Sequence, residues 1–504
     1  MKIYKTKAEQ FCHDILETDI NRTKAYVNIV MALGSEVEAS NPTSLSKSDF
    51  FQYHYSNISK VMKEVGLKLT SSEKRQFKRG FYSILKDYSP ENEVYKISSD
   101  YTTIRKPDSL TLANRGFVNI PNNRISKNAS IDAGYYISCV NLGLYDEAHP
   151  VSWSLPLDSH LIDLEEDKME FAANQLADLM RQIDLPFGKS TKVVNVADSG
   201  YSVPDYICPL LESFDNLLLI TRLRHGMKVY SPYTGEQSGK GRAKTYADQP
   251  HYLQVGHTRR CYNPKTKEHF DKTVCSIFDL PTSEEKEYDI VTRRGRQLIV
   301  KLYRWNDLLL RGTRQFAMHD KPFDLVCVRF IDKKTGELVF KKDMYLSLWG
   351  KQRRTHGTQE TQIDYKYRFD IEGHNRFMKQ HLLADKYQTP DVQHLEAWLW
   401  TVQTTFWLLY AASTDTEVHI NPWEKYLPEV KRAIESDAPL SAAMTRRGAK
   451  ALFSTFDLSA FTPQKSKNGK GRKKGDTQPR RKKHPPRRKH STEQNKKQKI
   501  EKLE

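Results

Sequence analysis

The order of secondary-structure patterns between residues 93 and 223 restricts the fold of this chain more than any other feature. Three stretches favour strands because they are rich in β-branched and aromatic residues or alternate between apolar and polar side chains. A stretch with apolar residues at helical spacing follows, then a short apolar run typical of a strand buried at a sheet centre. The expected strands are 93–104, 133–144, 150–157, 192–198 and 217–223, and the expected helices are 165–183 and 204–213.

This order, three strands, a helix, a strand and a helix, is that of an RNase H-like core. It predicts an α/β fold with a mixed sheet and flanking helices. Many short strand-like runs separated by charged turns then predict a β-rich insertion that interrupts the core. The expected units are a helical N-terminal domain at 1–90, the first part of the core at 91–226, the insertion at 227–348, the rest of the core with C-terminal helices at 349–461 and a disordered basic tail at 462–504.

The positive charge of the chain is concentrated at its C-terminal end. The net charge is +18, and residues 462–504 hold 17 lysines and arginines against four acids, a local +13 that leaves about +5 for the rest. With almost no apolar residues this tail cannot bury surface, so it is expected to be disordered. Its expected role is a non-specific grip on nucleic acid through counterion release, and a solubilising appendage is the alternative.

Residues 1–90 have apolar side chains at helical spacing. Thr70 followed by Glu73 predicts a capping box that opens a helix over 73–86. The basic residues of this helix, among them Lys78, are candidate DNA contacts. The equal alternative is a solvated helix of a small bundle.

The six cysteines form no CxxC pair and no Cys/His cluster, which argues against a structural zinc site and a disulfide framework. The N-terminus lacks the apolar segment of a signal peptide. The longest apolar stretch, 397–412, is interrupted by Thr and Gln, so a buried helix is expected there and not a membrane span.

Residues 365–379 combine a phenol, a guanidinium, a carboxylate and an ammonium in the spacing Y-x2-R-x3-E-x6-K. On one α-helix these four side chains fall within an arc of roughly 60°, a stripe too polar for a core. The acid can bind a metal ion while the donors bind phosphate oxygens, the layout needed to break a phosphodiester. A solvated helix face is the alternative. The four residues are Tyr365, Arg368, Glu372 and Lys379.

This spacing resembles the YREK signature of the DDE transposases of bacterial insertion sequences, in particular the IS-four-like group. Two-metal phosphodiester chemistry needs carboxylates from separate elements. Asp198 directly follows the buried run 192–197 and matches the second acid of the family triad. Asp100, inside the first expected strand, is the preferred first acid, with Asp132 as its rival, and Glu372 is the third.

The resemblance implies a DNA transposase that cuts at element ends and joins them to target DNA. Asp100, Asp198 and Glu372 are then the catalytic and metal-binding residues for two Mg²⁺ ions, with Mn²⁺ as a substitute. Arg368, Lys379 and Tyr365 become DNA-binding residues. The implied partners are terminal inverted repeats, target DNA and a second copy of the chain on DNA, with no membrane, in a bacterial cytoplasm near the nucleoid.

Two alternatives stay open from the sequence. One is a transposase-derived protein that binds DNA without cutting it, and the other is a structure-specific nuclease on the same core. Trp305 and Trp349 are conceivable stacking partners for a flipped base, although ordinary packing is the favoured role for each. His374 is expected to be a DNA or core contact and not a metal ligand.

Overall fold

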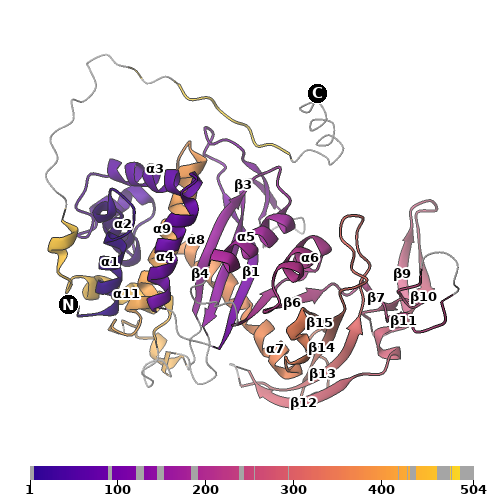
Figure 1. Cartoon of the computed structure of the whole chain (residues 1–504). Coiled ribbons are helices and arrows are strands. Elements are labelled where there is room, and N and C mark those ends of the chain that lie inside the picture. Colours follow the sequence, from indigo (N-terminus) through magenta and orange to yellow (C-terminus); the bar gives the residue numbers. More distant parts are fainter. Residues whose placement is uncertain are drawn as a thin grey trace, which may run out of the picture.

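The chain folds around a single large mixed sheet with helices packed beside it, which confirms the α/β class (Figure 1). The structure is a computed structural model. It describes residues 5–88, 93–120, 130–144, 153–182, 191–237, 243–254, 256–292, 295–417, 419–427, 430–431, 439–462, 477 and 480–488. Most of the expected tail lies outside these residues.

The middle of the sheet is formed by strands that are close together in the first half of the chain. β1 lies between β3, which is antiparallel to it, and β5, which is parallel to it. β6 continues in parallel beside β5, and β4 pairs antiparallel with β3. The bounds are β1 Val94–Arg105, β2 Gly116–Ile120, β3 Ser130–Leu144, β4 Trp153–Ile162, β5 Lys192–Ala197 and β6 Leu217–Leu223.

The strands between β6 and the YREK segment extend the same sheet. β15 pairs antiparallel with β6, and β14, β13 and β12 follow outward as antiparallel neighbours, so ten strands join into one sheet. Two small sheets lie in the same part of the sequence. The bounds are β7 Lys228–Val229, β8 His251–Tyr252, β9 Thr258–Asn263, β10 Glu268–Thr273, β11 Cys275–Ser276, β12 Glu284–Val291, β13 Gln297–Leu308, β14 Phe323–Asp332 and β15 Met344–Trp349.

The helices form two groups. Those from the two ends of the chain gather on one side of the sheet around α9, which itself packs on β4, and α5 to α8 form the second group (Figure 1). The bounds are α1 Lys7–Leu16, α2 Thr23–Ser35, α3 Ser56–Thr70, α4 Lys74–Tyr88, α5 Lys168–Gln182, α6 Pro204–Ser213, α7 Thr358–Tyr367, α8 Phe369–Gln380, α9 Val392–Ala412 and α11 Ala442–Phe453. The short 3-10 helices are η1 Pro42–Lys47, η2 Ser199–Tyr201, η3 Ile277–Asp279, η4 Lys351–Arg354, η5 Glu424–Tyr426 and η6 Leu458–Phe461.

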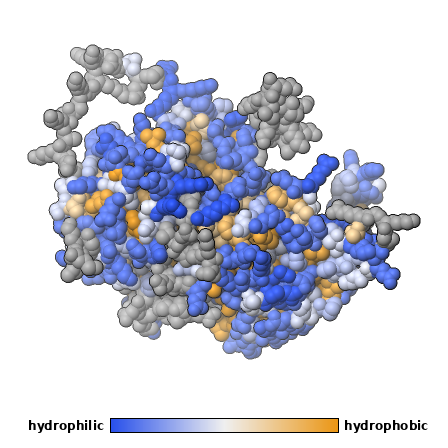
Figure 2. Space-filling model, viewed as in Figure 1, coloured by the Kyte–Doolittle hydropathy of each residue, from blue (hydrophilic) through white to orange (hydrophobic). Residues whose placement is uncertain are grey.

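Helix α9 is the centre of the helical group and is buried along most of its length. Its threonines satisfy their hydroxyls internally: Thr401 and Thr405 donate to carbonyls one turn earlier, and Thr404 also meets the Tyr26 hydroxyl at 2.8 Å. Such bonds let polar side chains sit in an apolar core. None of the helices within the described residues is both long and apolar enough to span a membrane. Hydrophilic residues cover most of the face shown in Figure 2.

The expected capping box at Thr70 is wrong. Thr70 ends α3 and donates its hydroxyl to the Gly66 carbonyl, so it belongs to the preceding helix. Glu73 instead forms an ion pair with Lys68 at 2.9 Å. Ser71 supplies the local contact, accepting a hydrogen bond from the Glu73 backbone N–H. Ser71 can stabilise the turn that leads into α4 because a serine hydroxyl reaches the backbone N–H two residues later.

The sequence suggested that Lys78 of α4 lies on the helix surface. In the structure it is buried against β4. Its ammonium lies 2.7 Å from an Asp158 carboxylate oxygen and 2.6 Å from His160 Nε2. His160 also contacts Glu396 of α9. Burial alone would raise the pKa of Asp158, but the charges of His160 and Lys78 outweigh it and hold the pKa below its usual range. This cluster joins α4, β4 and α9.

Replacing Lys78 tests this junction. Lys78→Met leaves Asp158 buried with His160 as its remaining cation, so we expect the free energy of unfolding to fall by about 3 kcal/mol. Arg79→Met, on the exposed side of the same helix, should change it by less than about 0.5 kcal/mol. Urea denaturation at neutral pH measures both variants. Equal losses would contradict a structural role for the buried ion pair.

Candidate active site

The first two candidate acids lie next to each other on neighbouring strands. Asp100 is inside β1, opposite Cys139 of β3. Ser99 pairs with Ala197, the last residue of β5, and Asp198 follows directly. Because β1 and β5 are parallel, the two carboxyl-bearing residues emerge at the same level of the sheet. The chain turns away after Asp198 into η2, where the Tyr201 N–H donates to the Asp198 carbonyl at 3.0 Å.

The third acid comes from a pair of helices and not from one continuous helix. α7 ends at Tyr367 and α8 begins at Phe369, with Arg368 between them in helical conformation at φ −52° and ψ −33°. At this junction a backbone hydrogen bond spans three residues and not four, because the Arg368 N–H donates to the Tyr365 carbonyl. Glu372 lies in the first turn of α8, and Lys379 in the last.

The expectation that all four side chains of the Y-x2-R-x3-E-x6-K stripe lie outside the core is wrong for Tyr365. Its side chain is fully buried in an apolar cluster with residues of β5 and β6, including Val196 and Ile220. The guanidinium of Arg368 lies 5.6 Å from the Tyr365 ring centre and 4.8 Å from the Phe369 ring centre. Tyr365 therefore anchors α7 on the sheet and supports Arg368.

Electrostatic interactions connect the three acids. Burial raises the pKa of Asp100 to about 6, and the charges of Glu372 and Asp198 add to the rise. Arg368 and the Tyr101 backbone N–H, which donates to Asp100 at 2.9 Å, oppose it. A carboxyl group whose pKa responds to two other carboxylates has both in its neighbourhood. Asp100 and Asp198 are thus neighbours on adjacent strands, and Glu372 is near enough for its charge to act on Asp100.

Arg368 is the cation of this cluster. It is 5% exposed, and one terminal nitrogen donates to Glu372 at 2.9 Å. Its Nε is buried and makes no hydrogen bond within the described structure. Burial opposes the charged form, but the surrounding Tyr365, Asp100, Asp198 and Glu372 raise the pKa of Arg368. An unpartnered buried N–H is costly, and an anionic oxygen would satisfy it.

Lys379 extends from the far end of α8 back to the sheet. Its ammonium donates to the hydroxyl of Thr102, two residues after Asp100 on β1. Burial lowers the pKa of Lys379, while Cys139, Asp385 and Asp100 oppose that shift. Arg368 and Lys379 therefore both lie within the electrostatic reach of Asp100.

The three acids carry the type of donor that a hard divalent cation takes. Its ligands would be carboxylate oxygens, which Mg²⁺ prefers, and a cation would offset the charges of the other two acids that help to raise the pKa of Asp100. The three carboxylates do not all lie within 4.8 Å of one another. Among the described residues, the group of possible metal ligands that does lie this close together consists of other residues. Glu372 is instead turned to Arg368.

That other group is His356, Glu360 and Asp364 at the start of α7. His356 lies 3.4 Å from Glu360 and 3.2 Å from Asp364. Two ammonium groups already face it: Lys96 lies 2.5 Å from Asp364, and Lys192 lies 3.2 Å from His356. Lysines supply the positive charge that a metal ion would bring, so this cluster is a buried ionic contact between α7 and the sheet.

The remaining candidates have other surroundings. Asp132 lies near the start of β3 opposite Val118, 3.9 Å from Arg105, and is not among the charges that act on Asp100. Trp305 and Trp349 are buried and donate to Leu280 O and Ser347 Oγ, so they pack within the protein. His374 is buried against Phe406, and burial lowers its pKa to about 4.

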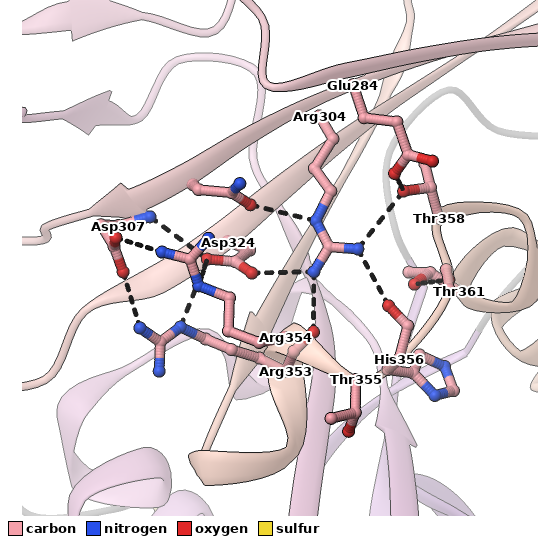
Figure 3. A network of polar contacts seen from close by, with 12 residues as sticks. Glu284, Arg304, Asp307, Asp324, Arg353, Arg354, Thr355, His356, Thr358 and Thr361 are labelled. Carbon is pink, nitrogen blue, oxygen red and sulfur yellow. Dashed lines mark hydrogen bonds and ion pairs between the residues drawn. The ribbon is translucent and has the colours of Figure 1, made fainter.

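A buried network that the sequence patterns did not indicate holds the entrance to α7 (Figure 3). Arg304 of β13 donates to Asp324 of β14 at 2.8 Å, to the Arg353 carbonyl at 2.7 Å and to the His356 carbonyl at 2.9 Å. Arg353 in turn donates to Asp324 at 3.2 Å. Asp324 is a charged residue in a mostly apolar stretch of sequence, and this pattern could have indicated a buried ionic network from the sequence.

The site thus joins three acids, two cations and the rim of a mixed sheet. Two of the acids come from adjacent parallel strands. The third comes from α8, which contains Lys379 and directly follows Arg368. No family model and no curated protein matches the sequence.

Asp100→Asn tests the buried charge. Because folding raises the pKa of Asp100 to about 6, its ionised form costs free energy in the folded state above that pH and nothing below about pH 4. We expect Asp100→Asn to be more stable than the natural protein by about 1–3 kcal/mol at pH 8, with no difference near pH 4.

Asp132→Asn is the matched control, since Asp132 also accepts a hydrogen bond from the N–H of the next residue. Its effect should be small and should not follow this pH profile. Denaturant unfolding of metal-free protein at several pH values provides the measurement. A pH-independent effect of Asp100→Asn would show that the carboxyl is not under electrostatic stress.

Proposed function

We propose that this chain is a metal-dependent DNA transposase that cuts DNA at element ends and transfers the cut strand into target DNA. The observation that carries the proposal is the adjacency of Asp100 and Asp198 on neighbouring parallel strands, with the Arg368–Glu372 pair within electrostatic reach of them. These acids are far apart in the sequence, and a purely structural role does not call for three carboxylates with a single buried guanidinium among them. Negative charge gathered at this cost is typical of a catalytic site.

The arrangement of strands supports an RNase H-like core. The order β4-β3-β1-β5-β6, with β3 antiparallel to β1 and with β5 and β6 parallel to it, is the one expected for that fold. Residues 227–348 would then be its insertion, and α7 and α8 would complete the core. Asp198 directly follows the end of β5, the level at which open α/β sheets place their sites, and Asp100 lies beside it within β1.

Asp100, Asp198 and Glu372 would hold two Mg²⁺ ions, for which Mn²⁺ is the expected substitute. The chemistry supplied by the bound ions is Lewis-acid activation of the attacking oxygen and stabilisation of the leaving 3′-oxygen. Release of Glu372 from its ion pair with Arg368 would free both groups, the carboxylate for a cation and the guanidinium for phosphate. This exchange needs no change in the fold, because the two side chains are neighbours on one helix turn.

Arg368 and Lys379 would bind the DNA backbone on either side of the acids. The rings of Tyr365 and Phe369 restrict the guanidinium plane of Arg368, and its terminal nitrogen that donates to Glu372 would be the one released for phosphate. Lys379 would add a point charge at the Thr102 end of the site. Tyr365 would contribute through Arg368 and not through a phosphate contact of its own, since it is buried.

The proposed partners are terminal inverted repeats, target DNA and a second copy of the chain that pairs two ends on DNA. The basic tail would add sequence-independent affinity. The proposed location is the bacterial cytoplasm, at the nucleoid. The ion pair between Arg368 and Glu372 also suits a protein that binds DNA without cutting it, and catalytic variants separate these two functions.

Asp198→Asn and Glu372→Gln should each abolish cleavage of a labelled element end in Mg²⁺ while DNA binding persists. Loss of about 4 kcal/mol of transition-state stabilisation corresponds to about a thousandfold in rate. Asp132→Asn should cleave normally because Asp132 lies outside the acid cluster. Gel assays of cleavage and mobility-shift assays of binding measure the two properties. Variants as active as the natural protein would leave only the non-catalytic function.

Removing residues 464–504 should weaken DNA binding and flatten its dependence on salt. On duplex DNA the slope of log affinity against log salt falls by about 0.9 for each phosphate that the protein no longer neutralises. The preferred sequence should not change, since the tail contributes charge and not base recognition. Fluorescence anisotropy across a salt series measures this, and an unchanged slope would assign the tail to solubility.

A further inference from the structure

Part of the basic tail is seated on the sheet. Residues 480–488 lie beside residues 110–116, which lead into β2, and Figure 1 draws this segment in yellow at the edge near β3. The His484 N–H donates to the Leu110 carbonyl and the Arg487 N–H to the Arg115 carbonyl, both at 2.8 Å. Gly116 and Arg487 form a parallel β-bridge. The segment is therefore held through its backbone and not by charge alone.

A buried arginine specifies this contact. Arg115 is 1% exposed and donates to the Lys106 carbonyl at 2.8 Å and the Pro107 carbonyl at 3.0 Å. Its other terminal nitrogen donates to the His484 carbonyl at 2.6 Å. A buried guanidinium needs acceptors for its N–H groups, and the tail supplies one of them. Residues 110–116 thus contain a preformed donor for a chain that lies where 480–488 lie.

Acidic residues complement the tail at the same place. The loop and first turn at 163–170 contain five acids. Asp163, Glu165 and Glu166 lie near the tail, whereas Asp167 and Glu170 line a separate pocket against α4. Glu165 lies 3.9 Å from the Arg487 guanidinium. A groove of about 280 Å³ is bounded by Glu166, Lys168, Arg487 and Arg488, among other residues. These side chains are largely exposed, so their attraction is modest and sensitive to salt.

The groove beside the docked segment also extends toward β1, the strand that carries Asp100. Lys168, on the wall of the groove, lies 3.1 Å from the Tyr136 ring centre and 5.2 Å from the Tyr101 ring centre. Tyr101 follows Asp100 in β1. Lys168 therefore lies between the groove at the tail and the strand that carries Asp100.

We propose that residues 110–116 with the acidic segment 163–166, together the tail-docking surface, bind residues 480–488 of the same chain when DNA is absent, and that DNA competes for the tail. Side chains that pair with acids of the protein are not available for phosphates, so docking limits non-specific DNA binding. The docking stands on the contacts above, whereas the competition rests on the proposed DNA-binding function.

Two full-length variants isolate the docking. Arg487→Pro and Arg487→Ala remove the same charge, but only proline also removes the N–H that donates to the Arg115 carbonyl. Hydrogen exchange at the His484 amide reports docking without DNA, and anisotropy with a short random-sequence duplex in metal-free buffer reports DNA affinity. We expect exchange about tenfold faster in Arg487→Pro than in Arg487→Ala, and DNA binding about threefold or more tighter.

Equal exchange rates in the two variants would overturn the docking. Unequal exchange with equal DNA affinities would overturn the competition. Failure of every form of the protein to bind DNA, with slow His484 exchange only where residue 487 keeps its N–H, would reject the proposed DNA-binding function and still support the docking.

Discussion

The candidate site depends on the antiparallel pairing of β15 with β6. After β6 the chain forms the outer strands β12 to β14 of the same sheet and comes back beside β6 itself only at β15, and the register that sets Leu219 opposite Trp349 fixes where α7 can begin. Gly350 makes the exit with φ of 110°, and a Cβ there would lie 2.4 Å from the Leu217 carbonyl oxygen, so a glycine is required. The Arg304 network then holds the next residues, and Arg368 and Glu372 arrive over β1 and β5.

The same site opposes the stability of the sheet. An ionised carboxyl in the central strand is unfavourable, and the nearby Asp198 and Glu372 increase that cost. Arg368 offsets part of it, and the rings of Tyr365 and Phe369 keep this arginine in place. Elsewhere the protein buries ions in closed sets, such as Lys78 with Asp158 and Arg304 with Asp324, where each charge has an opposite partner. The acid cluster is different because its negative charges exceed its positive ones.

Several elements could be predicted because their signal is local. The helix expected at 165–183 is α5, and the apolar run at 192–198 is β5 followed by Asp198. The predictions failed where a residue's surroundings come from distant parts of the chain. Lys78 has the spacing of a surface lysine, yet it meets β4 and α9, and Tyr365 has a polar hydroxyl, yet its ring fills a gap above β5 and β6. Pattern and propensity describe a residue's neighbours in sequence and not those across the fold.

The sequence by itself determined the α/β class, the buried central strand and the spacing that sets Arg368, Glu372 and Lys379 on one side of a helical segment, since these follow from periods of two and 3.6 residues. Only the tertiary structure decided that the strands before α7 extend the same sheet, that Asp100 and not Asp132 shares the field of the other acids, and that residues 480–488 lie on the β2 edge. These outcomes depend on strand register and on the pairing of charges between distant segments, and both are fixed when the core closes.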